Sequence, residues 1–86
     1  SAEAAEALAV AVRNWSGADI GLAETGIAGP GGGSEERPVG LFYIALADGG
    51  GVTSRRFDFN DGRSANRLAC AEAALQMLIG HVQAPG

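Results

Sequence analysis

The alternation of hydrophobic and polar positions predicts two amphipathic helices with three strands between them. Apolar residues recur at helical spacing in residues 2–15 and again in residues 62–82. Residues 18–24, 39–47 and 52–59 instead have the short apolar or alternating patterns of strands. The sequence therefore predicts an α/β protein with the order helix, strand, glycine-rich loop, strand, hairpin, strand, helix.

Each predicted helix is expected to pack on the sheet through its apolar stripe, with Ser1 capping the first helix and Gly17 ending it. The stripe of the first helix comprises Ala5, Leu8, Ala9, Val12 and Trp15. The stripe of the second helix comprises Leu68, Ala71, Leu75, Leu78, Ile79 and Val82. Because Trp15 lies at a helix end, we expect it to be a packing residue rather than a ligand-stacking one.

The three predicted strands differ in how they are covered. Small residues such as Gly21 and Ala23 share one face of the first strand, which suggests that a helix lies close to that face. Residues 39–47 are apolar at nearly every position, as in a central strand that is covered on both sides. The alternating pattern of residues 52–59 indicates a strand nearer an edge, and Asp48 with the glycines after it predicts a hairpin turn.

The segment from Glu24 to Gly40, ETGIAGPGGGSEERPVG, is unusually long for a connection between two strands. Glycine lets the backbone approach a bound group, and consecutive backbone N–H groups can form an anion-binding concavity. Pro30 restricts the loop, but the loop matches neither of the common phosphate-binding motifs, GxxxxGK[ST] and GxGxxG. A ligand-binding loop and a flexible surface loop are both compatible with this composition.

Composition narrows the possible functions of the chain. Its 86 residues suffice for one small domain, and the net charge of −4 gives no basic surface for nucleic acid or for a membrane. The single cysteine and the absence of a signal peptide favour a cytoplasmic protein. With no lysine, one histidine and one cysteine, a metal site of several His or Cys ligands is excluded, and catalysis would need other side chains or another polypeptide.

Arg63 and Arg67 lie four residues apart at the start of the last predicted helix, where the helix dipole disfavours cations. An anionic partner is therefore expected. Asp58 or Asp61 would give an exposed salt bridge, whereas a phosphate or carboxylate ligand would be held by the paired guanidinium groups.

The segment GADIGLAETGIAGPGGGSEERPVGLFYIALA, followed by RFDF, Arg63, Arg67 and an Ala-Ala-Leu helix, closely resembles the C-terminal domain of the competence/damage-inducible CinA family. The resemblance spans essentially the whole chain, and TGIAGPGGG followed by PVG is its most specific part. It implies a three-layer α/β/α domain that hydrolyses nicotinamide mononucleotide to nicotinic acid mononucleotide and ammonia, with no metal or other cofactor.

In that family the chemistry is associated with a serine nucleophile in a TAESCTGG-like segment and a lysine in a YSNEAK-like segment. Both segments lie upstream of the region that this chain resembles, so no catalytic residue can be assigned here. We therefore expect residues 1–86 to be one domain, truncated at its N-terminal side, that acts with a complementary N-terminal half or as a homo-oligomer. A non-catalytic half-domain that binds nucleotides or self-associates is the alternative.

The resemblance transfers a set of substrate-binding residues. These are Thr25, Gly26, Ile27, Ala28, Gly29 and Pro30 of the glycine-rich loop, together with Arg63 and Arg67, which are expected to face the substrate phosphate. The chain departs from the family at Glu24, where a small or apolar residue is more usual. A Glu24 carboxylate that pointed into the pocket would repel a phosphate.

Overall fold

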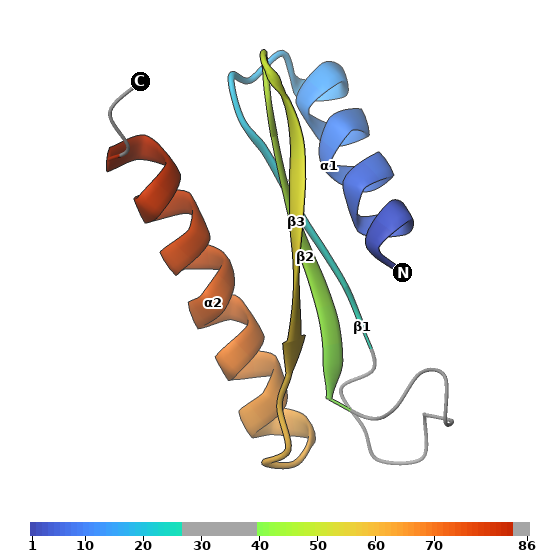
Figure 1. The fold of residues 1–86 in the computed structure, drawn as a ribbon, viewed down its shortest axis with the longest axis vertical. Coiled ribbons are helices and arrows are strands. Elements are labelled where there is room, and N and C mark those ends of the chain that lie inside the picture. The colour runs from blue at the N-terminus through green and yellow to red at the C-terminus, as the bar shows by residue number, and fades with distance from the viewer. Residues whose placement is uncertain (27–39, 84–86) are drawn as a thin grey trace.

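The computed structural model describes residues 1–26 and 40–83, which form three layers with one helix on each face of a sheet (Figure 1). The elements are α1 (Ala2–Ser16), β1 (Gly21–Gly26), β2 (Leu41–Asp48), β3 (Gly51–Asp58) and α2 (Arg63–Gln83). The predicted α/β class and element order are confirmed, with boundaries that shift by a few residues. Neither α1 nor α2 is both long and apolar enough to cross a membrane.

The sheet is antiparallel with the order β1-β2-β3. The predictions that the strand after the loop is central and that the last strand lies at an edge are both confirmed. The hairpin turn between β2 and β3 is stabilised by Asp48. Its Oδ1 accepts hydrogen bonds from the N–H groups of Gly50 at 2.7 Å and Gly51 at 3.1 Å. This turn fixes the β2–β3 register, in which Phe42 lies opposite Phe57.

One face of the sheet is covered closely by α1. Ser1 caps the helix by accepting a hydrogen bond from the N–H of Ala4 at 3.1 Å, and Gly17 ends it in the left-handed conformation. Ala5 and Ala9 are fully buried against alanines of β2. A β carbon on Gly21 would lie 2.1 Å from the Ala9 carbonyl oxygen, so the predicted close approach of a helix is confirmed.

The other face of the sheet carries the larger side chains and is covered by α2. Phe42 and Ile44 of β2 pack with Cys70 and Ala74 of α2. Phe59 joins them, with its ring centroid 5.8 Å from that of Phe42. The aromatic rings come from the sheet, and the helix contributes small side chains at the centre of the contact.

The predicted apolar stripes of both helices were partly wrong. Leu68, Leu75, Ile79 and Val82 of α2 are exposed, and so are Leu8, Val12 and Trp15 of α1, the last with 88% of its surface accessible. In α1 only the predicted Ala5 and Ala9 are buried against the sheet. In α2 a different stripe of smaller residues, Asn66, Cys70 and Ala74, faces the sheet. The physical reason is volume, because α1 lies too close to the strands for larger side chains and the phenylalanine rings fill the space beneath α2.

Candidate functional site

A cavity of about 340 Å³ lies where β1 and β2 meet the first turns of α2. It is lined by Glu24, Gly26, Phe42, Arg63 and Arg67. The end of β1, the start of β2 and the start of α2 lie at the same end of the molecule, although they are far apart in the sequence (Figure 1). The fold therefore brings Gly26 together with both arginines that the sequence suggested as ligand-binding residues.

Neither Arg63 nor Arg67 forms an ion pair with a carboxylate in residues 1–26 or 40–83. Asp58, one of the two partners considered from the sequence, lies 3.3 Å from Arg56 instead. Both arginines are exposed in the first two turns of α2, where the dipole of the helix opposes their charge. An anion in the cavity would offset this cost and accept charge-assisted hydrogen bonds from the guanidinium groups.

Asn66 fixes the helix turn that carries the two arginines. It is only 1% exposed, its Oδ1 accepts a hydrogen bond from the Asp61 N–H at 2.9 Å, and its own N–H donates to the Gly62 carbonyl oxygen at 2.8 Å. The sequence analysis missed this residue. The sequence feature that could have indicated a buried role for Asn66 is its position one helical turn before Cys70, on the stripe of small residues.

Glu24 reaches the same cavity from the sheet, and Cys70 holds it there. The Cys70 thiol donates a hydrogen bond to Glu24 Oε2 at 3.0 Å and is 0% exposed. Burial, together with the hydrogen bond to Glu24 and the negative charge of its carboxylate, raises the pKa of Cys70 from 9.0 to about 12. The thiol therefore stays protonated at neutral pH, so it acts as a hydrogen-bond donor and not as a nucleophile.

The other loop residues suggested by the sequence are not in this cavity or are not described. Thr25 lies on the α1 face of the sheet, where its Oγ1 donates to the Ser1 carbonyl oxygen at 3.3 Å. Ile27, Ala28, Gly29 and Pro30 lie outside the described residues. Their assignment to a substrate pocket stays a prediction.

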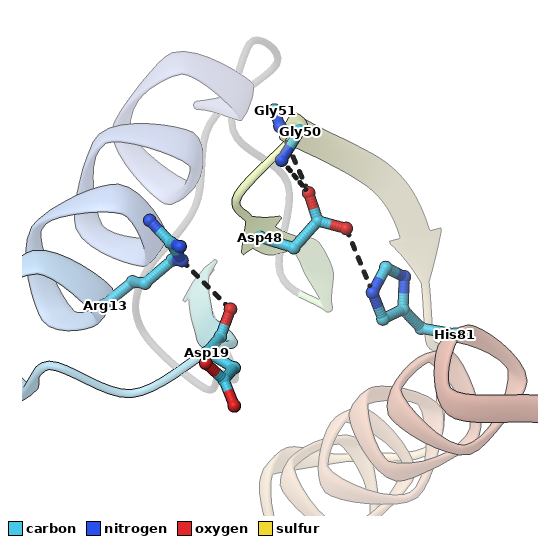
Figure 2. Close-up of polar contacts among 6 residues, drawn as sticks. All are labelled: Arg13, Asp19, Asp48, Gly50, Gly51 and His81. Atoms are coloured by element: carbon cyan, nitrogen blue, oxygen red, sulfur yellow. Dashed lines mark hydrogen bonds and ion pairs between the residues drawn. The ribbon is translucent and has the colours of Figure 1, made fainter. Parts of the chain in front are cut away.

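A second polar cluster lies at the opposite end of the sheet (Figure 2). His81 Nε2 is 3.1 Å from Asp48 Oδ2, and Arg13 Nε donates to the Asp19 carbonyl oxygen at 2.9 Å. Cavities of about 360 and 240 Å³ are lined by His81 with Leu46 and Thr53. The Asp48 carboxylate already interacts with His81 and with the turn, so this cluster ties the hairpin to the end of α2.

The described residues contain no group of three or more His, Cys, Asp or Glu side chains placed to hold a metal ion. The cavity at the start of α2 has a different character. It combines two guanidinium groups, one carboxylate, an aromatic ring and a glycine. This arrangement can bind an anion that carries further polar groups.

Comparisons with known proteins agree with this fold. The sequence profile of the CinA C-terminal domain matches residues 1–82. A CinA-like protein of Syntrophomonas wolfei is 42% identical over the whole chain, and one of Geobacter sp. strain M21 is 47% identical over 95% of it. The crystal structure of the competence/damage inducible protein CihA from Agrobacterium tumefaciens superposes with a TM-score of 0.90 at 42% identity, covering 96% of this chain.

The chain spans only part of each of these proteins. It covers 21% of the Syntrophomonas protein, 20% of the Geobacter protein and 52% of the Agrobacterium chain. The match therefore concerns the region that forms α1 to α2, and the activity of a complete relative does not follow from it.

Proposed function

Because the chain belongs to the CinA C-terminal domain family, we propose that it forms the substrate-binding half of a nicotinamide mononucleotide amidohydrolase. In the proposed reaction, water converts the carboxamide of nicotinamide mononucleotide into the carboxylate of nicotinic acid mononucleotide and releases ammonia. The substrate carries a phosphate at one end and the reacting amide at the other. Binding of the phosphate then positions the amide for attack.

The observation that supports this proposal most directly is the cavity that contains Arg63 and Arg67. Guanidinium groups bind phosphate through parallel N–H donors, and these two have no carboxylate partner among residues 1–26 and 40–83. Gly26 lines the same cavity, and a β carbon at this position would collide with the Phe42 ring and the Leu41 carbonyl oxygen. The role proposed for this chain is therefore to hold the phosphate.

The bond-breaking groups are proposed to come from other residues. The described residues that line the cavity include no hydroxyl or thiol group, and the chain has no lysine. A serine of an N-terminal half would attack the carboxamide carbon, ammonia would leave, and water would then release nicotinic acid mononucleotide from the serine. A lysine of the same half would act as the general base and acid that accepts and donates protons in these steps.

The exposed apolar faces of the two helices support the need for such a half. In α2 the exposed apolar residues Leu68, Leu75, Ile79 and Val82 recur along one helix, and Leu68 is 70% exposed. Trp15 of α1 is 88% exposed. Exposed apolar residues that gather on one face are typical of a surface that another part of a protein covers. The Agrobacterium chain has nearly half of its length beyond the region matched here. In this proposal the corresponding residues pack against both helices and complete the active site.

The test is ammonia release from nicotinamide mononucleotide by this chain joined to an N-terminal half of a CinA-family domain. Arg63→Gln and Arg67→Gln should each raise KM about tenfold or more, because a hydrogen bond to a charged group contributes about 1.5–3 kcal/mol. Arg56→Gln, an exposed arginine that pairs with Asp58, is the matched control and should leave KM unchanged.

A folded complex that releases no ammonia would contradict the proposed reaction. If that complex still bound nicotinamide mononucleotide through Arg63 and Arg67, the non-catalytic nucleotide-binding role would be favoured instead. A stable monomer of the isolated chain would count against the role of the exposed helix faces.

A further inference from the structure

The carboxylate of Glu24 lies in the cavity that is proposed to bind a phosphate, and this needs a physical explanation. Among the described residues, the Glu24 carboxylate forms no ion pair with Arg63 or Arg67, and it accepts a hydrogen bond from Cys70. A carboxylate beside a phosphate repels it. A site for phosphate alone would therefore be weakened by this side chain.

The position of the Glu24 carboxylate is fixed by a hydrogen bond. Its Oε2 accepts from the buried Cys70 thiol, which is fixed on α2 between Asn66 and Ala74. An ionised carboxylate has about four acceptor positions, so this bond leaves acceptor capacity for a ligand. The cavity thus contains two donors of charge-assisted hydrogen bonds and one fixed acceptor.

The ligand group that meets Glu24 must be a hydrogen-bond donor that is covalently close to the anion. Glu24, Arg63 and Arg67 line the same cavity of about 340 Å³, so a single small ligand can contact all three. In a nucleoside monophosphate the sugar is attached to the phosphate, and the base lies farther away. Sugar hydroxyl groups are good donors to a carboxylate, as in other nucleotide sites where an acidic side chain binds the ribose hydroxyls.

We propose that Glu24 is a specificity-determining residue that accepts hydrogen bonds from the hydroxyl groups of a sugar whose phosphate is bound by Arg63 and Arg67. The cavity then binds sugar phosphates in preference to inorganic phosphate. This inference deepens the proposed function and rests on it for the role of the two arginines. It does not depend on the reaction at the amide.

The experiment is a calorimetric titration of ribose 5-phosphate and of inorganic phosphate into this chain joined to the N-terminal half. The measured quantity is the ratio of the two dissociation constants. Because both ligands are titrated into the same sample, an unfolded fraction cancels from the ratio. Glu24→Ala removes the acceptor, Glu24→Gln keeps its size without the charge, and Glu72→Gln removes an exposed carboxylate of α2 outside the cavity as the matched control.

The native protein should bind ribose 5-phosphate about tenfold more tightly than phosphate, the gain expected from one hydrogen bond to a charged acceptor. Glu24→Ala should abolish this preference, because it should weaken the binding of ribose 5-phosphate and strengthen the binding of inorganic phosphate. The ratio of dissociation constants for Glu24→Gln should lie between those of the native protein and Glu24→Ala. The ratio for Glu72→Gln should equal that of the native protein.

An unchanged ratio in Glu24→Ala, or no preference in the native protein, would overturn the role of Glu24 while leaving ammonia release untouched. Failure of both ligands to bind would overturn it as well. Loss of ammonia release with the predicted ratios intact would contradict the proposed reaction alone.

Discussion

The two faces of the sheet are packed in opposite ways. On the α1 face, alanines and Gly21 bring the helix backbone almost into contact with the strand. On the α2 face, phenylalanine rings and Cys70 hold the helix farther away, and three cavities are lined partly by residues of α2. The same three strands thus support a tightly packed layer on one side and space for a ligand on the other.

This difference separates the residues that maintain the fold from those that are available for binding. A substitution on the α1 face should act mainly on stability. A substitution at the start of α2 should act mainly on ligand affinity. The largest effect is expected on the α1 face and the smallest at the far end of α2.

Gly21→Ala should destabilise the protein by about 2 kcal/mol or more, within the range found for overpacked sites. The new β carbon would lie 2.1 Å from the Ala9 carbonyl oxygen and 2.8 Å from the Arg13 β carbon. Gly80→Ala in α2 is the matched control, because no atom lies within 4 Å of its β-carbon position. The control should be stabilised by about 0.5–1 kcal/mol, since alanine favours helix more than glycine does. Urea unfolding measures the change in the free energy of unfolding for both variants. Equal losses of stability in the two variants would contradict the proposed difference in packing.

Alkaline pH should weaken the α2 face through Cys70. Its pKa is raised from 9.0 to about 12 in the folded protein, so folding favours the protonated thiol. The resulting stability is present below pH 9 and is lost as the pH rises from 9 toward about 12, because the unfolded chain releases the proton first. Stability measured against pH should fall more steeply for the native protein than for Cys70→Ala. A thiol that titrates near pH 9 in the folded protein would contradict this prediction.

The smallest effect is expected at the far end of α2. The side chains of His81 and Asp48 are 35% and 37% exposed, so His81→Ala should cost less than about 1 kcal/mol. Asp48→Ala should cost about 1 kcal/mol more, because it also removes the acceptor for the Gly50 and Gly51 N–H groups. Thermal unfolding of both variants checks the order, and a larger loss for His81→Ala would show that this contact stabilises the α2 face more than its exposure suggests.

Hydrophobic periodicity was sufficient to predict the elements of this fold and their order, whereas the three layers were implied by the family resemblance. The continuous apolar run of β2 predicted a central strand, and Gly21 with Ala23 predicted a close helix. Periodicity could not choose between the two apolar stripes of α2. The stripe with Leu68 and Leu75 has the stronger hydrophobic pattern. The stripe of smaller residues with Cys70 and Ala74 faces the sheet because the space beneath α2 is too small for the larger side chains.

The site was only partly predictable for a similar reason. Arg63 and Arg67 were identified by their unfavourable position at a helix start, and Gly26 by its family motif. Glu24 was recognised as a departure from the family, but its contact with Cys70 depends on the register of β1 and the rotation of α2. Asn66 was missed because a buried polar residue on a small-residue stripe has no distinct pattern in the sequence.

The central claim is that the cavity at the start of α2 is the ligand-binding site of the α2 face. Backbone amide chemical shifts during titration with nicotinamide mononucleotide test it most directly, in the chain joined to its N-terminal half. The largest shifts are expected at Gly26, Arg63 and Arg67, with little change at Gly50 and His81. Largest shifts around Gly50 and His81, with Arg63 and Arg67 unaffected, would contradict the claim.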